Sequence, residues 1–253
     1  MVGEGVNHNK MTANLFAYLP RWVVLLSLAL VAGLVAMMLP VASAHASALS
    51  EGLVCTTSKS EAFVLTTRTG YILTPDGNSI YMWGYANGND PFQYPGPNLC
   101  VNQGDKVTVT LRNTLPVASS LIFTGLQAVK VDGLDSRPDF ANNSLTKAVP
   151  AGGSATYTFT AANSGTYLYE SGTNPELQVR MGMVGALIVH PRGPVAAGSP
   201  PGTVGPVLGD HVYTEPWTRY DTAHEYLQML SEVDPDMHSA VEKAVTDMPT
   251  TKV

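Results

Sequence analysis

Charged side chains are scarce in this 253-residue chain, and basic ones are scarcer than acidic ones. Asp, Glu, Lys and Arg together make up 13% of the residues, and the formal net charge is −6. Proteins bind nucleic acids largely through Lys and Arg side chains that replace the counterions of the phosphates. The acidic balance of this chain therefore argues against nucleic acid as a partner.

Motifs of common catalytic sites are also missing. The sequence contains no Gly-x-Ser-x-Gly nucleophile elbow, no Walker phosphate loop and no His-Glu-x-x-His zinc motif. Each of these motifs holds a reactive group in a fixed backbone geometry. The chain therefore carries no local signature of a hydrolase, a nucleotide-dependent enzyme or a zinc protease.

Cysteine occurs only twice, at Cys55 and Cys100. Cys55 precedes the first expected strand, and Cys100 opens another. In an exported protein a disulfide between them is permitted, and it would pin the start of the domain. Such a loop stabilises by roughly 3–4 kcal/mol in the chain-entropy model. We favour the bridge over two separate buried thiols, because exported free thiols tend to oxidise.

Long apolar runs are absent except near the N-terminus. Trp22 to Leu39 is an uncharged, mostly apolar run that follows Lys10 and Arg21, and Val41 to Ala46 then offers small residues suited to a cleavage site. The run also reaches the lower length limit of a membrane span, about 18 residues. Residues 1–46 are therefore expected to be a signal peptide, with an uncleaved membrane anchor as the alternative. In both cases the rest of the chain is expected to be extracytoplasmic.

Short segments that alternate between apolar and polar side chains are abundant, and Gly and Pro (23 and 18 copies) separate them. In Lys106–Asn113, for example, Val107, Val109 and Leu111 share one face. Several such strands at close spacing, without helical periodicity, predict a two-sheet β-sandwich. The expected strands are Ala62–Thr67, Ser79–Ala86, Leu99–Val101, Lys106–Asn113, Ser119–Gly125, Ser154–Thr160, Gly165–Tyr169 and Val184–Val189.

Six short motifs follow one another in an order and spacing that are typical of one family. They are Met82-Trp-Gly-Tyr85, Pro95-Gly-Pro97, Gln103-Gly-Asp105, Arg112-Asn-Thr-Leu-Pro116, Val149-Pro-Ala-Gly-Gly153 and Gly165-Thr-Tyr167. Together they resemble the N-terminal cupredoxin (plastocyanin-like) domain of multicopper oxidases, over about Ser79 to Val189. The resemblance implies an all-β, cupredoxin-like Greek-key sandwich, with copper as the cofactor of the family.

The resemblance also implies where copper ligands would lie. The family has His-x-His-Gly in one strand and Gly-Thr-Tyr-x-Tyr-His-x-His in another. In this sequence the four histidine positions are occupied by Ile122, Thr124, Glu170 and Gly172. Copper needs imidazole or soft sulfur ligands in a fixed geometry. We therefore expect no metal at these positions, and copper remains a cofactor at the level of the family only.

Three other residues are weak candidates for a site. Met181 and Met183 could bind Cu(I) through their thioethers, but packing in the core is the favoured interpretation. His190 follows the last expected strand and is interpreted as a surface residue. A copper thiolate at the cysteines is disfavoured, because no histidine lies near either cysteine in the sequence.

Glu170 is expected to point between the sheets and to be partly buried. An unpaired buried carboxylate is costly, so we expect it to pair with Arg180 or to accept backbone hydrogen bonds. A role as general base is the alternative, and it is disfavoured because buried carboxylates are often structural.

The C-terminal part of the chain differs in composition. After a Pro/Gly-rich segment, Glu225–Ser231 is expected to be a strand, followed by a short helix with Asp234 as N-cap and Pro235 in its first turn. His238 lies one turn from Asp234, but we interpret this helix as solvated rather than metal-binding. The order resembles the opening of the family's second cupredoxin domain. The expected division is a cupredoxin-like domain (50–191), a linker (192–209) and an incomplete second cupredoxin domain (210–253).

These features predict an exported binding or structural module rather than a self-sufficient oxidase. One alternative is the N-terminal part of a longer or split multicopper oxidase, an oxidoreductase whose other domains bring the remaining copper sites. The other is an extracellular assembly subunit that adds its C-terminal strand to another chain. The expected partners are accordingly the missing cupredoxin domains or another protein chain, and a membrane is contacted only through the N-terminal segment.

Overall fold

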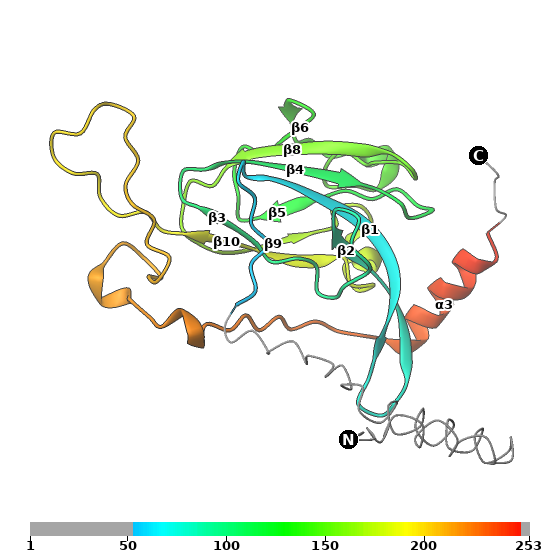
Figure 1. Cartoon of the computed structure of the whole chain (residues 1–253). Helices are drawn as coiled ribbons and strands as arrows, with labels where there is room; N and C mark the ends of the chain where they lie inside the picture. The colour runs from blue at the N-terminus through cyan, green and yellow to red at the C-terminus, as the bar shows by residue number, and fades with distance from the viewer. Residues whose placement is uncertain (1–52, 249–253) are drawn as a thin grey trace, which may run out of the picture. The chain divides into compact units, whose positions relative to one another are not determined.

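The structure is a computed structural model that describes residues 53–248, so the expected signal peptide or membrane anchor lies outside the described residues. Two β-sheets form the body of the described chain (Figure 1). None of the helices in this range is long and apolar enough to cross a membrane. The six-stranded sheet has the order β2 (Ser79–Asn87), β1 (Ala62–Leu73), β4 (Lys106–Arg112), β8 (Ser154–Thr160), β6 (Lys130–Val131) and β7 (Leu134–Asp135). The four-stranded sheet has the order β3 (Leu99–Asn102), β10 (Val184–His190), β9 (Gly165–Glu170) and β5 (Ile122–Thr124).

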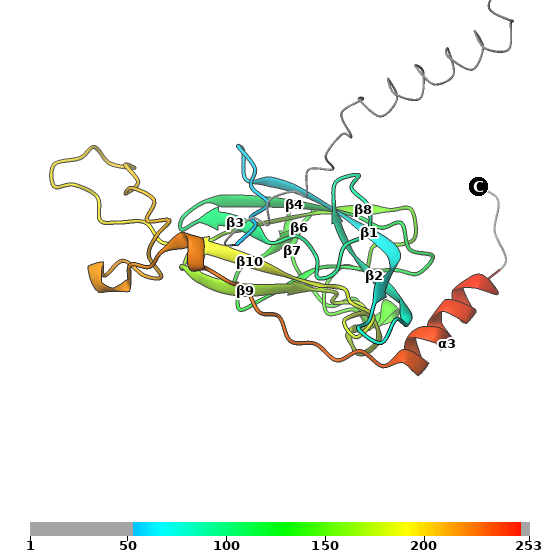
Figure 2. The same cartoon turned by 60° about the horizontal axis from the view of Figure 1, so that its bottom comes forward.

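The two sheets pack face to face as a cupredoxin-like β-sandwich, and the two layers separate clearly in Figure 2. The eight strands expected between residues 62 and 189 are present, and their alternating pattern explains how they build the core. Val107, Val109 and Leu111 of β4 are at most 1% exposed, while the residues between them face outward. Antiparallel pairing places Tyr157 of β8 opposite Val109. Fully burying each aliphatic side chain of this kind contributes about 1.5–3 kcal/mol.

Two short strands, β6 and β7, lie between β5 and β8, where the sequence predicted no strand. They form a hairpin whose turn residues, Asp132 and Gly133, have φ angles of 49° and 80°. Positive φ at both central residues is the geometry for which Asp-Gly is favoured. The hairpin extends the sheet because β6 pairs with β8.

The helix expected near the C-terminus is confirmed as α3 (Pro235–Thr246). The side chain of Asp234 accepts hydrogen bonds from the backbone amides of Asp236 and Met237, at 3.1 and 3.2 Å, and so caps the helix. The interpretation of this helix as solvated is wrong for one face. His238 is fully buried, with ring nitrogens 2.5 Å from the Tyr81 carbonyl oxygen and 3.1 Å from that of Arg180.

The strand expected at Glu225–Ser231 is not formed. These residues run without a β-pairing partner, below the sheet that contains β9 and β10 in Figure 1. Leu227 and Met229 line a pocket together with Ala186 of β10. The segment therefore packs on its own domain through side chains, and its backbone joins no sheet.

Residues 192–209, the expected linker, form a loop that is closed at its base. Arg192 bridges to Val207. The Arg192 guanidinium also donates hydrogen bonds to Asp105, at 2.9 Å, and to the Gln103 carbonyl oxygen, at 2.8 Å. These bonds tie the start of the loop to the turn before β4. The short helix α2 (Pro175–Gln178) and the 3-10 turns Phe140–Asn142, Pro216–Thr218 and Thr222–His224 complete the described elements.

Candidate functional site

The four residues that the family resemblance places at histidine positions, Ile122, Thr124, Glu170 and Gly172, come together at the β5 edge of the four-stranded sheet. Antiparallel pairing places Ile122 opposite Glu170. The Thr124 hydroxyl donates a hydrogen bond to the Glu170 carboxylate, at 3.2 Å. A Cβ atom added to Gly172 would lie only 2.7 Å from the Cγ2 atom of Ile122. The structure therefore gathers these four residues, which lie far apart in the sequence, into one patch, here called the β5–β9 patch.

Three of the four residues of the β5–β9 patch lie on the face of the sheet that points away from the core, and Gly172 is buried beside them. Successive side chains of a strand point to opposite faces, and Phe123 and Tyr169 are the ones that fill the core, at 5% and 0% exposure. Their neighbours Ile122, Thr124 and Glu170 consequently lie on the outer face. The expectation that Glu170 points between the sheets is wrong, because Tyr169 holds the inward position.

The pairing expected between Glu170 and Arg180 is also wrong. Arg180 lies nearest to two acidic side chains of the C-terminal segment, with its guanidinium 3.4 Å from Glu232 and 3.7 Å from Asp234. The Thr124 hydroxyl is instead the partner of Glu170. A half-exposed carboxylate needs no buried cation, so no strong electrostatic constraint acts on Glu170.

The side chains of the β5–β9 patch do not fit a copper cluster. Ile122 and Gly172 have no donor atom at all, and Thr124 and Glu170 offer a hydroxyl and a carboxylate. Such oxygen ligands suit hard cations, whereas protein copper sites use imidazole, thiolate and thioether ligands. No step of copper chemistry can therefore be assigned to these four side chains.

A buried network of hydroxyl groups supports the patch, and sequence reasoning missed it. The Thr173 hydroxyl donates to Ser120, at 2.8 Å, and Ser144 lies 2.9 Å from Thr173 and 3.2 Å from Ser120. All three residues are at most 4% exposed. The network links the start of β5 to the segment after β9, and so fixes Ile122 against Gly172. No local pattern of the sequence predicted this network, because its three residues lie in segments far apart in the chain.

Two buried tyrosines flank the same region. Tyr85 donates a hydrogen bond to the Ser120 carbonyl oxygen, at 3.1 Å, and Tyr169 donates to that of Pro97, at 2.7 Å. Burial raises the pKa of both phenols well above its usual value. Both therefore remain neutral donors and neither can act as a base. The Tyr85 bond links β2 of the six-stranded sheet to the segment before β5 of the four-stranded sheet.

The remaining sequence candidates lie elsewhere. Met181 and Met183 are fully buried in the core, as the packing interpretation expected. His190 is half-buried at the end of β10. The disulfide between Cys55 and Cys100 is confirmed, with an S–S distance of 2.02 Å and a Cα–Cα distance of 5.6 Å. A His190 ring nitrogen and the two sulfur atoms all lie within 4.8 Å of one another, which sequence distance had hidden.

Comparison with known proteins agrees with this architecture. The family model of multicopper oxidases matches residues 70–194. Laccase-1 of Cryptococcus neoformans is 35% identical over 127 residues, which cover 49% of this chain and 19% of the laccase. Laccase abr2 of Aspergillus fumigatus is 30% identical over 128 residues, which cover 51% of this chain and 19% of that laccase. The chain thus spans about a fifth of the length of these relatives.

Similar solved structures include the McoA multicopper oxidase of Aquifex aeolicus, at 21% identity and a TM-score of 0.46 over 55% of this chain and 29% of that one. Another is the copper nitrite reductase of Nitrosomonas europaea, at 25% identity and a TM-score of 0.40 over 55% of this chain and 42% of that one. The match of the family model and the two-sheet architecture together show that the chain contains a cupredoxin-like domain of the multicopper oxidase family.

Proposed function

We propose that this chain acts as a copper-free cupredoxin module, which binds other protein domains and is not an oxidase by itself. One observation carries the proposal: the four residues at the family's histidine positions are gathered in one patch, yet they offer no nitrogen or sulfur atom. The framework for a metal site is kept, and the donor atoms that copper requires are replaced.

The direction of the patch supports a binding role. Ile122 and Thr124 project from the outer face of the four-stranded sheet, so a domain that docks on this face would contact them. Leu168, two residues before Glu170 on the same face, is 41% exposed. This outer face combines exposed apolar side chains with a hydroxyl–carboxylate pair. Such a composition is typical of a surface that another protein domain covers.

Copper analysis of the purified chain tests the proposal. The oxidised protein is incubated with Cu(II), desalted, and measured for copper content, for electron paramagnetic resonance and for oxidation of a phenolic substrate. We expect no stoichiometric copper and no oxidase activity. Histidine-bound copper at one or more ions per chain would refute the proposal.

A second candidate function is the N-terminal part of a longer or split multicopper oxidase. It is favoured by the comparison in which the chain spans 19% of the length of two laccases. In that case the other domains supply the copper ligands, and this domain supplies one of the two surfaces at which the domains meet. The mass of the native gene product in its source, measured with an antibody against residues 53–248, distinguishes the two: a product much larger than the 26.8 kDa of this chain supports the longer oxidase.

Export from the cytoplasm belongs to the same proposal. The disulfide between Cys55 and Cys100 supports it, because such bonds persist mainly in oxidising compartments.

The division at residues 191 and 209, and a role for the C-terminal segment in another chain, also remain proposals. Sedimentation of the mature protein tests the latter, since a strictly monomeric protein contradicts it.

A further inference from the structure

A potential metal site lies at the opposite side of the domain from the β5–β9 patch, around the disulfide. Parallel pairing of β3 with β10 sets Cys100 beside Ile188 and Asn102 beside His190. Leu187 and Val189 point into the core, so Ile188 and His190, which alternate with them along β10, lie on the outer face. The two sulfur atoms and one nitrogen of His190 lie within 4.8 Å of one another.

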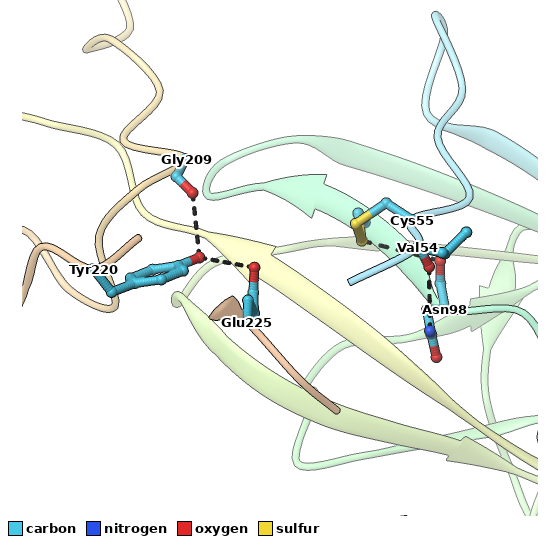
Figure 3. The surroundings of a disulfide bond; sticks show 7 residues. Val54, Cys55, Asn98, Gly209, Tyr220 and Glu225 are labelled. Carbon is cyan, nitrogen blue, oxygen red and sulfur yellow. Dashed lines mark hydrogen bonds between the residues drawn. A yellow bond between two sulfur atoms is a disulfide. The ribbon is translucent and has the colours of Figure 1, made fainter. Parts of the chain in front are cut away.

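The two cysteines are held together by backbone bonds that do not depend on the disulfide. Thr56 donates its amide to the Asn98 carbonyl oxygen, at 2.7 Å, and accepts from the Cys100 amide, at 3.0 Å. The Asn98 side chain donates to the Val54 carbonyl oxygen, at 3.2 Å, as Figure 3 shows beside the disulfide. After the S–S bond is cleaved, these bonds still keep the two sulfur atoms near each other.

The imidazole of His190 is the only one in the described range without a hydrogen-bond partner. His211 is bound to Asp210 and His224 to Asp221, each at 2.8 Å, and His238 lies between two carbonyl oxygens. His190 lines a groove of about 300 Å³ with Tyr220 and Glu225. Figure 3 shows Tyr220 and Glu225 bonded to each other across β10 from the disulfide. The ring nitrogens of His190 are therefore accessible to an ion that enters from solvent.

We propose that reduction of the Cys55–Cys100 disulfide opens a three-ligand site for a thiophilic d10 ion, formed by the two thiolates and His190. A dithiol donates two electrons and two protons, becomes a disulfide itself, and leaves Cys55 and Cys100 as thiols. The ion then displaces one proton from each thiol and binds both sulfur atoms and the imidazole. The oxidised domain cannot bind the ion in this way, because neither sulfur is a thiolate.

The distances suit this change. With Zn–S bonds of about 2.3 Å and a Zn–N bond of about 2.0 Å, a tetrahedral site needs roughly 3.8 Å between sulfurs and roughly 3.5 Å from sulfur to nitrogen. After the disulfide is cleaved the sulfur atoms are free to separate to this distance, and the His190 nitrogen already lies within 4.8 Å of both of them. Two thiolates and one imidazole are ligands that select Zn(II) or Cu(I), and water would complete a tetrahedral site as the fourth ligand.

Cobalt(II) titration of the full chain tests the site, with Co(II) as a coloured probe for zinc. The disulfide is reduced by an immobilised phosphine, which takes the oxygen of water and becomes a phosphine oxide, and the phosphine is removed before metal is added. We expect one Co(II) per reduced chain, with a thiolate-to-metal absorption band that Zn(II) abolishes, and no such band in the oxidised chain. The variant His190→Gln should bind roughly tenfold more weakly or worse, and the matched control His224→Gln should bind like the parent.

Three results overturn the proposal. One is equal cobalt binding by the oxidised chain, and another is equal binding by His190→Gln. The third is a reduced chain that binds no cobalt, whether or not its near-ultraviolet circular dichroism shows that the sandwich persists. Folding of each variant is checked in its oxidised form, where the disulfide supports the domain. The outcome is independent of the copper analysis above, because that experiment uses the oxidised protein and the β5–β9 patch.

Discussion

At the β5–β9 patch, one glycine shows how closely the framework is packed. A Cβ atom on Gly172 would meet the Cγ2 atom of Ile122 at 2.7 Å, the Ser120 hydroxyl at 3.2 Å and a methyl of Thr146 at 3.2 Å. Ile122 is branched at Cβ and therefore has little rotamer freedom with which to yield. A side chain at position 172 is accommodated only if position 122 changes as well.

This contact predicts a strong coupling between the two positions. Gly172→Ala should lower the free energy of unfolding by about 1–3 kcal/mol through overpacking. Ile122→Ala removes the methyl group in contact, so the double variant should be more stable than the sum of the two single effects predicts. Urea unfolding of the four proteins of the cycle measures this, and simple additivity would contradict the contact.

A second residue-scale prediction concerns pH. The Lys147 ammonium group, and then the Thr156 backbone amide, hold the pKa of Asp132 below its ordinary value. A carboxylate with a lowered pKa in the folded state stabilises the fold above its unfolded pKa, and this stabilisation is lost as the pH falls through the folded pKa. Asp132→Asn keeps the turn preference and removes the charge.

Wild type should therefore be more stable than Asp132→Asn at neutral pH, and the difference should shrink in acid. Urea midpoints at neutral pH and at about pH 3, near the ordinary aspartate pKa, measure it. Asp135→Asn, in the same hairpin, is the matched control, because its carboxylate accepts no hydrogen bond from the described residues. A wild-type advantage that persists unchanged in acid would contradict the cause assigned to the shift.

At the scale of elements, the sequence predicted the strands and the helix whose positions are determined by a local pattern of side chains. The strand Lys106–Arg112 was predictable because its side chains alternate strictly, and α3 because Asp234 and Pro235 give it a defined start. The β6–β7 hairpin was missed because strands of two residues carry no periodicity. The segment Glu225–Ser231 has strand composition, but it lies along the face formed by β9 and β10 and pairs with no described strand, so no ladder forms.

The same limit applies to the candidate sites. The four positions of the β5–β9 patch were predictable from the family resemblance, but their outward direction follows from which neighbour fills the core, Tyr169 rather than Glu170. The closeness of His190 to the disulfide depends on parallel pairing of β3 with β10. Such pairing joins residues far apart in the chain, and no local pattern encodes it.

Docking of α3 gives a prediction at this scale. His238 is buried, and its ring bridges the carbonyl oxygens of Tyr81 and Arg180. His238→Ala leaves both oxygens without this partner, at a cost of about 1–3 kcal/mol for a buried group, so the helix should detach. Hydrogen exchange of residues 235–246 should accelerate, while exchange in β4 and β8 stays slow. Ser239→Ala, an exposed neighbour, should change neither, and unchanged exchange in His238→Ala would contradict the docking role.

At the scale of the whole described chain, the disulfide connects the segment before β1 to the edge of the four-stranded sheet. It closes a loop with a sequence separation of 45 residues. The bridge and the backbone bonds of Thr56 act on the same segment, so they support each other. This arrangement keeps the start of the domain fixed beside β3.

The double variant Cys55→Ser/Cys100→Ser should therefore lose roughly 4 kcal/mol of unfolding free energy, by the chain-entropy estimate for a loop of this length. Equilibrium unfolding in guanidinium, compared with the oxidised parent, measures the loss. The reduced parent should resemble the double variant in the absence of metal. A loss below about 1 kcal/mol would show that the backbone bonds alone hold the segment.

The central claim is that the domain has kept the framework of a multicopper oxidase and lost the donor atoms. Copper(II) titration of the oxidised protein beside the triple variant Ile122→His/Thr124→His/Glu170→His, followed by electron paramagnetic resonance, tests it most directly. We predict no stoichiometric copper in the wild type and about one nitrogen-coordinated ion in the triple variant, because the three new imidazoles project from one outer face. Nitrogen-coordinated, stoichiometric copper in the wild type, or a folded triple variant that binds none, would contradict the account.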